Sequence, residues 1–156
     1  MKIKLIVIGK TNTDYLKTGE NEYEKRLKHY CKFEEIVIND VKNGGKFSIN
    51  ELKIKEGELI LKKIGSIDKV ILLDNNGKIN SSNEFSNFLK GNMLNGTKNL
   101  VFIIGGAYGF SLDVYNRANN KLSLSKMTFT HQMVRLIFKE QLYRAFTIHK
   151  REKYHH

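Results

Sequence analysis

The 156-residue sequence has no proline, one cysteine and comparatively few acidic residues. The absence of proline excludes collagen-like and proline-rich scaffolds. A single cysteine, Cys31, cannot form an internal disulfide, and the sequence has no HExxH or CxxC pattern of the kind that binds zinc. We therefore expect a protein that is stabilised by its own hydrophobic core and that holds no metal.

Long hydrophobic runs are also absent. The longest, Val70–Leu73 and Leu100–Ile104, have the length of strands and fall far short of the ~20 residues that a membrane span needs. The first residues, Met1–Leu5, lack the apolar stretch and the small-residue cleavage site of a secretory signal. We expect a cytoplasmic protein with no membrane partner.

Acidic residues are too few to balance the basic ones, since 16 Asp and Glu stand against 27 Lys and Arg and leave a net charge of +11. A surplus of this size favours an anionic partner, with RNA or DNA first and acidic membranes or proteins after them. A basic composition without any polyanion partner is the alternative. The length and the 40% of hydrophobic residues predict one domain, residues 1–156, with a sizeable core.

Apolar runs alternate with amphipathic stretches along the whole chain. Their spacing predicts strands at residues 2–8, 33–38, 69–74, 100–104 and 121–125, and helices at 14–30, 48–64, from 81, 112–118 and 131–150. Asn75-Asn76-Gly77 is predicted to be a turn, and Ser48-Ile49-Asn50-Glu51 has the form of a capping box. Alternation of this kind predicts a three-layer α/β/α fold with a parallel sheet and a ligand site at the carboxyl ends of its strands.

The first segment with candidate chemistry is Gly105-Gly106-Ala107-Tyr108-Gly109, which directly follows an apolar strand. Glycines at such a place allow a sharp turn and let a ligand approach the backbone amides. The segment matches neither the dinucleotide fingerprint nor a Walker A loop, so a tightly cradled phosphate is disfavoured. A plain structural turn is the alternative.

The second segment, residues 124–131, joins the last strand to the closing helix. Its hydroxyls, its lysine and its apolar side chains are suited to wrapping an adenine and a ribose, with Met127 and Phe129 lining the pocket. The alternative is an ordinary connection in which Thr130 is the helix N-cap.

The third segment is the closing helix with its tail, where only Glu140 and Glu152 oppose a series of basic side chains. Guanidinium groups bind phosphates bidentately and stack on bases, so this segment is the candidate RNA surface. A solvated charged helix face is the alternative. The basic residues are Arg135, Lys139, Arg144, Lys150, Arg151 and Lys153.

These segments belong to a pattern that extends over essentially the whole chain. It comprises Leu72-Leu73-Asp74, Ile103–Gly106 with Gly109, Leu122–Thr128, His131–Ala145 and the ending Tyr154-His155. The pattern resembles the bacterial 23S rRNA pseudouridine N3-methyltransferase family, RlmH. The resemblance implies a SPOUT-type α/β fold with a C-terminal trefoil knot, a homodimer, S-adenosylmethionine as methyl donor, and N3 of pseudouridine 1915 in the assembled ribosome as acceptor.

The resemblance also implies which residues bind the donor. The matching positions are Leu73, Gly105, Leu124, Ser125, Lys126, Met127, Thr128 and Phe129. The family pattern has proline where this chain has Thr130 and Lys153, so we expect the pocket loop and the tail to be less rigid here.

The acceptor nitrogen of a uracil-type ring carries a proton at neutral pH. An enzyme must therefore stabilise the developing anion or remove that proton. We hypothesise that Arg135 or Arg144 stabilises the anion and that His155, delivered by the tail of the partner subunit, accepts or relays the proton. Two alternatives stay open, a non-catalytic ribosome-binding protein and a small nucleotide-binding enzyme that acts on a metabolite.

Overall fold

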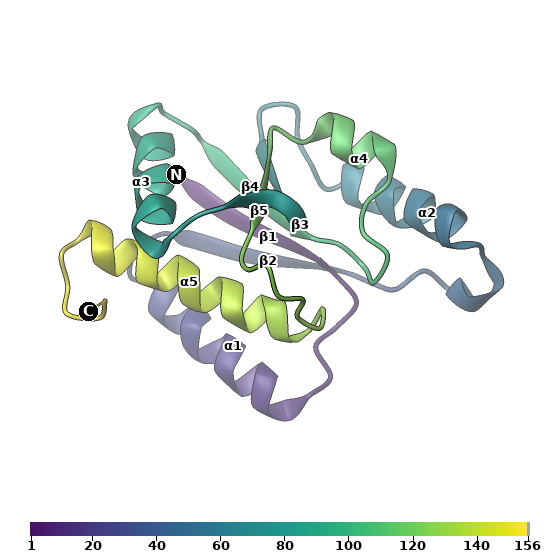
Figure 1. Cartoon of the computed structure of the whole chain (residues 1–156), viewed down its shortest axis with the longest axis horizontal. Helices are drawn as coiled ribbons and strands as arrows, with labels where there is room; N and C mark the ends of the chain where they lie inside the picture. The colour runs from purple at the N-terminus through teal and green to yellow at the C-terminus, as the bar shows by residue number, and fades with distance from the viewer. Residues whose placement is uncertain (156) are drawn as a thin grey trace.

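A five-stranded parallel sheet organises residues 1–155, the part of the chain that the computed structural model describes (Figure 1). The strands lie in the order β2-β1-β4-β3-β5, and every pairing between them is parallel. This confirms the parallel sheet expected from the sequence. The strands are β1 (Lys2–Ile8), β2 (Lys32–Ile38), β3 (Lys69–Ile79), β4 (Asn99–Ile104) and β5 (Asn120–Ser123).

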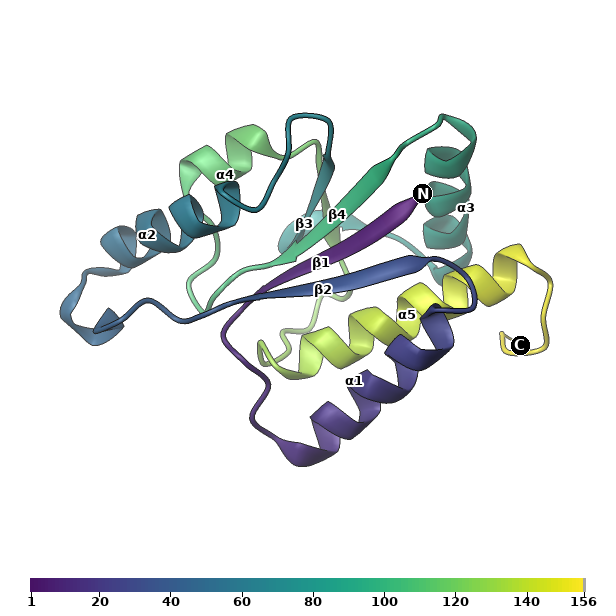
Figure 2. The ribbon, with the colours of Figure 1, turned by 180° about the vertical axis from the view of Figure 1, so that it is seen from behind.

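Helices cover both faces of the sheet, as the three-layer prediction requires (Figures 1 and 2). One face carries α1 (Asp14–Leu27), α3 (Ser82–Leu94) and α5 (Met133–His149). The other carries α2 (Ile49–Leu61) and α4 (Leu112–Arg117). None of these helices is both long enough and apolar enough to cross a membrane.

The central strands β1 and β4 are buried on both faces because each face is covered by helices. Phe102 of β4 packs on Phe138 of α5 with ring centroids 4.8 Å apart, whereas Ile103 points into the cluster under α2 and α4. Cys31 packs against the core that contains Phe102 and Phe138, and burial raises the pKa of its thiol to about 12. It is therefore a packed, unreactive thiol at neutral pH.

Local signals set the helix starts well. Ser48 and Glu51 form the expected capping box at α2, and Ser81 and Glu84 form a second one at α3. The hydroxyl of Thr130 accepts a hydrogen bond from the Met133 amide at 3.3 Å, although regular α5 begins only at Met133. Expected and observed helix ends otherwise differ by up to about three residues, as is usual for frayed termini.

The course of β3 corrects one prediction. The expected turn Asn75-Asn76-Gly77 lies inside a strand that continues to Ile79, because Leu73 and Lys78 both pair with Leu122 and the residues between them bulge out. At Gly77 the chain crosses β5 so closely that a Cβ would lie 2.6 Å from backbone atoms of Leu122. Figure 1 shows β3 curving across β5 at this place. Only a residue without a side chain permits this crossing. The trefoil knot itself stays a prediction from the family resemblance.

Candidate active site

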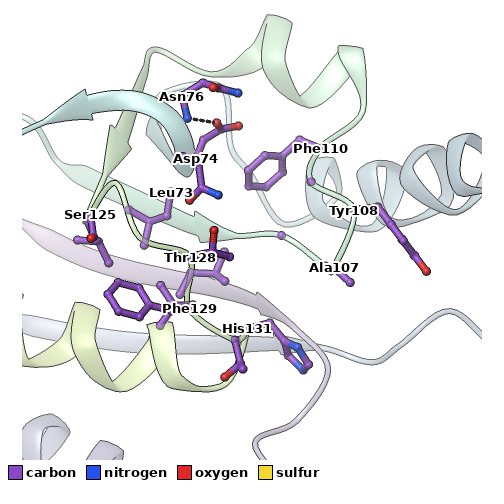
Figure 3. A pocket seen from close by; sticks show the side chains of 18 of the residues that line it. Leu73, Asp74, Asn76, Ala107, Tyr108, Phe110, Ser125, Thr128, Phe129 and His131 are labelled. Atoms are coloured by element: carbon purple, nitrogen blue, oxygen red, sulfur yellow. Dashed lines mark hydrogen bonds between the residues drawn. The ribbon is translucent and has the colours of Figure 1, made fainter.

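A cavity of about 610 Å³ opens at the carboxyl ends of β4 and β5, beside the bulge of β3 (Figure 3). Three separate segments form its walls: residues 73–76 inside β3, the glycine loop 105–110 after β4, and residues 124–131 between β5 and α5. Its volume is within the range of pockets that bind small molecules. Its place at the carboxyl edge of the sheet is the one expected for a parallel α/β fold.

The structure brings the donor-binding positions of the resemblance together at this cavity. The residues that line it include Leu73, Gly105, Leu124, Ser125, Met127, Thr128 and Phe129. Lys126 belongs to the same loop but is absent from the lining. The glycine loop and the segment 124–131, which were separate signals in the sequence, are therefore two walls of one cavity. Their role in donor binding stays a prediction.

Hydrogen bonds within the loop after β5 fix its shape. The Ser123 hydroxyl donates to the Ser125 carbonyl at 2.8 Å, and the Met127 amide donates to the Ser125 hydroxyl at 2.9 Å. Met127 and Phe129 keep much of their side chains exposed at the rim of the cavity. The rim therefore has apolar side chains that a ligand would cover.

The opposite wall contains Asp74, which the family pattern includes, together with Tyr115 and Phe110, which the sequence did not single out. Asp74 accepts hydrogen bonds from the Asn76 amide at 2.7 Å and from the Tyr115 hydroxyl (Figure 3 draws the first). Burial and the bond to Asp74 raise the pKa of Tyr115 to about 12. Phe110 packs on Gly105, where a Cβ would lie 2.9 Å from its ring. Asp74 lies at the end of the apolar run of β3, which is a usable signal in the sequence, whereas nothing local places Tyr115 beside it.

The charge of the lining contrasts with that of the chain. The described residues that line the cavity include no lysine and no arginine, and their one carboxylate is that of Asp74. A cavity without lysine or arginine in a protein of charge +11 is poorly suited to a phosphate and well suited to a cationic ligand.

A family model described as "Predicted SPOUT methyltransferase" matches residues 1–155. The chain belongs to this SPOUT methyltransferase family. It is also similar over its full length to proteins named "Ribosomal RNA large subunit methyltransferase H". The identity is 57% to the one from Flavobacterium psychrophilum and 55% to the one from Christiangramia forsetii, in each case over 99% of the relative. It is 53% to the one from Cytophaga hutchinsonii, over the whole relative.

In this SPOUT methyltransferase, Arg135 lies beside the cavity loops but is buried and is not part of the lining. Its guanidinium donates to the carbonyls of Ile8 and Gly9, the latter at 3.0 Å, and to the Thr11 hydroxyl at 3.1 Å. Burial lowers its pKa, although nearby carboxylates oppose this effect. These bonds attach the start of α5 to the end of β1.

Lys139 is fully buried as well, so the prediction of an exposed basic surface was wrong for Arg135 and Lys139. The Lys139 ammonium lies 2.5 Å from Glu20, 2.6 Å from Glu24 and 2.6 Å from Glu35. Among the described residues, these three glutamates form the group whose carboxylates are close enough together to hold a metal ion. The cation that lies between them is the Lys139 ammonium. The charge pattern of a solvated helix and that of a helix with buried ion pairs are alike in sequence.

Arg144 contacts Tyr154 of the tail, the residue that precedes His155, in the half of α5 that is away from the cavity. The Arg144 Nε donates to Glu140 at 3.0 Å, and its guanidinium lies 4.7 Å from the ring centre of Tyr154. The Nδ1 of His155 is enclosed and has no hydrogen-bond partner in the described part of the chain. His156 lies outside the described residues. Arg144 lies 11 residues along α5 from Met133, about 17 Å, and the tail begins only after all 17 residues of the helix, about 25 Å from its start near the cavity (Figure 1).

Proposed function

We propose that this protein is an rRNA methyltransferase that transfers the methyl group of S-adenosylmethionine to N3 of pseudouridine 1915 of 23S rRNA in the assembled ribosome. The observation that carries the proposal is the cavity built by the three family segments and free of lysine and arginine side chains. The names of the relatives support the rRNA substrate, and the family supports methyl transfer.

The lining fits the proposed donor. When bound, S-adenosylmethionine supplies a methyl group on a positively charged sulfonium, whose sulfur leaves as a neutral thioether. Leu73, Leu124 and Phe129 offer apolar contacts for an adenine, and the hydroxyls of Ser125 and Thr128 offer hydrogen bonds. The glycine loop provides backbone groups that a ligand approaches without obstruction.

The distance along α5 bears on how the acceptor is activated. Arg144 and the tail cannot reach the cavity of their own chain without leaving their contacts, since Arg144 is in the second half of α5 and the tail follows the end of that helix. We therefore propose a homodimer in which the helices α5 run antiparallel, so that the tail of each chain completes the cavity of the other. Isologous association of this kind is the commonest symmetry of soluble dimers.

In the proposed dimer, His155 accepts the N3 proton of the pseudouridine and Arg144 stabilises the negative charge that develops on the ring. The nitrogen lone pair then forms the bond to the methyl carbon. Arg135, whose donors already bind Ile8, Gly9 and Thr11, holds α5 in place instead of contacting the acceptor.

Basic residues near the tail remain available for rRNA. Lys150, Arg151 and Lys153 are exposed, unlike Arg135 and Lys139 on the same helix and tail. Lys126 is exposed beside the cavity. We expect these groups to contact phosphates, so binding to ribosomes should weaken steeply as salt rises.

The decisive experiment measures transfer of tritium from S-adenosylmethionine to assembled ribosomes and to free large subunits, with the modified nucleotide mapped. We expect transfer to pseudouridine 1915 in assembled ribosomes only. Ribosome binding without transfer, combined with no S-adenosylmethionine binding in calorimetry, would instead support a non-catalytic ribosome-binding protein.

Complementation between subunits tests the shared site. Thr128→Lys weakens donor binding at the cavity and His155→Ala removes the proposed base from the tail, so at donor concentrations below the wild-type KM both homodimers should lose most of their activity. After the two are unfolded and refolded together, half of the dimers contain one of each, and activity should return to roughly a quarter of the wild-type value. A mixture without activity would show that cavity and tail of the same chain work together.

A further inference from the structure

The tail after α5 is directed by a helix-terminating turn that contains an arginine where glycine is usual. Arg151 has a φ of 58°, its amide donates to the Ile148 carbonyl at 3.0 Å, and the Glu152 amide donates to the Thr147 carbonyl at 2.9 Å. This is the hydrogen-bond pattern of a Schellman motif. The turn sends the tail back along the helical face of the molecule instead of away from it (Figure 1).

Tyr154, three residues further on, is held between α1 and α5. Its hydroxyl lies 3.2 Å from the hydroxyl of Tyr23 and donates to Glu140 at 3.1 Å. Its ring meets Tyr143 edge-on with centroids 4.8 Å apart, and Arg144 lies over its face. Burial and the bond to Tyr23 raise the pKa of Tyr154, so the phenol stays protonated and able to donate at neutral pH.

A second tyrosine of the same region of the chain holds the tail at Glu152. The Tyr30 hydroxyl donates to the Glu152 carboxylate, and the Lys150 ammonium lies 4.8 Å from the centre of the Tyr30 ring. Tyr23 and Tyr30 are seven residues apart, which places them on one side of α1 and of the turn that follows it. Both rings pack on Tyr143 of α5. The two hydroxyls thus contact two tail residues that flank Lys153.

We infer that Tyr23 and Tyr30 are positioning residues, which hold the tail so that His155 has one defined direction. The inference rests on the proposed function, because it gives the ordered tail a role in methyl transfer. His155 directly follows Tyr154, so a fixed Tyr154 restricts the backbone of His155. Lys153, which occupies a family proline position, cannot supply this restraint, and the tyrosine contacts supply it instead. The Nδ1 of His155 is enclosed and has no hydrogen-bond partner within the described residues, so no bond of that atom holds the ring and its direction depends on the backbone that the tyrosines fix.

The test uses Tyr23→Phe, Tyr30→Phe and their combination, with Tyr15→Phe on the exposed part of α1 as the matched control. Each substitution removes one hydroxyl and keeps the ring. Since a hydrogen bond contributes about 1 kcal/mol, each of the two single variants should lower kcat about fivefold, and the double variant should lower it further. The KM for S-adenosylmethionine should not change, and Tyr15→Phe should match the wild type.

Backbone ¹⁵N relaxation of the same variants separates positioning from a general loss of structure. We expect the order parameters of Tyr154 and His155 to fall from about 0.85 to below about 0.6 in the double variant, with α5 unchanged. Order parameters that stay high, or a kcat that stays within twofold of wild type after the tail has become mobile, would overturn the inference. If the wild type itself transfers no methyl group, the proposed function fails, while the relaxation data still report whether the tyrosines hold the tail.

Discussion

The Nζ of Lys139 on α5 lies 2.5 Å from an Oε of Glu20 on α1, and both side chains are buried. Glu24 and Glu35 complete the surroundings of the ammonium at 2.6 Å each. Burial acts to lower the pKa of Lys139, but the carboxylates outweigh it and the pKa is raised. The lysine therefore stays charged and joins α1 and β2 to the helix that leads from the cavity to the tail.

Lys139→Met should be strongly destabilising. The methionine keeps most of the volume but leaves three carboxylates without their cation, and breaking a buried ion pair from one side costs about 3–5 kcal/mol. Urea unfolding measures this loss as a lower midpoint. Lys25→Met, at an exposed position of α1, should change the free energy of unfolding by less than about 0.5 kcal/mol.

The stability of the Lys139→Met variant should depend on pH in a defined direction. Without the lysine, the buried carboxylates should bind protons more tightly in the folded than in the unfolded protein, so lowering the pH should restore stability. Burial already raises the pKa of Glu35 in the wild type. We expect the deficit relative to wild type to shrink from pH 7 towards about pH 4.5, and a constant deficit would contradict this account.

Gly77→Ala should also destabilise the protein, through a steric cause. A methyl group at Gly77 would lie 2.6 Å from the backbone of Leu122, which cannot move as a flexible side chain could. Overpacking of this kind costs about 1–3 kcal/mol, and it should also weaken donor binding because β5 leads into the cavity loop. Thermal unfolding and calorimetry with S-adenosylmethionine measure the two effects.

Gly91→Ala is the matched control for that variant. Gly91 lies inside α3 and has open space where a Cβ would point, so the same added methyl group meets nothing. Because alanine favours helices over glycine, we expect stability to rise by up to about 1 kcal/mol. Equal effects at both positions would show that the crossing at Gly77 tolerates a side chain.

The contrast between these glycines shows what the sequence could and could not predict. Strand and helix periods, capping boxes and the carboxyl-edge site depend on local spacing, and the structure confirms the fold they predict. The crossing at Gly77 brings together residues 77 and 122, which are 45 positions apart in sequence. Asn75-Asn76-Gly77 by itself predicts an ordinary turn, so the crossing could not be predicted from it. The burial of Arg135 and Lys139 likewise depends on acceptors contributed by β1, α1 and β2.

Glu56→Gln should stabilise the protein at neutral pH. Glu56 of α2 is buried against the glycine loop, where a Cβ on Gly106 would lie 2.5 Å from its carboxylate. Burial, with a smaller effect from Asp40, raises its pKa, so the folded protein binds this proton more tightly and the charged form costs stability above that pKa. A neutral amide removes the cost.

The expected gain is a rise in Tm of roughly 2 °C at pH 7, which shrinks as the pH falls and disappears near about pH 3, where the wild-type carboxyl is protonated in both states. Glu58→Gln, at an exposed position of the same helix, should leave Tm unchanged at both pH values. A lower Tm for Glu56→Gln at pH 7 would show that the charged form has a stabilising partner.

The absence of lysine and arginine from the cavity lining predicts the effect of adding a lysine. Thr128→Lys places an ammonium on an exposed loop position that faces the cavity, so folding should be unaffected (Figure 3). At about 10 Å and an effective dielectric constant near 20, repulsion between this charge and a sulfonium amounts to about 1.7 kcal/mol. We therefore expect the affinity for S-adenosylmethionine to fall at least about tenfold.

The affinity for the neutral product S-adenosylhomocysteine should fall much less, because only the sulfonium differs between the two ligands. Thr18→Lys on the exposed face of α1 adds the same charge far from the cavity and should leave both affinities unchanged. Equal losses for the cationic and the neutral ligand would point to steric obstruction, and the charge of the cavity would then have no part in selecting the donor.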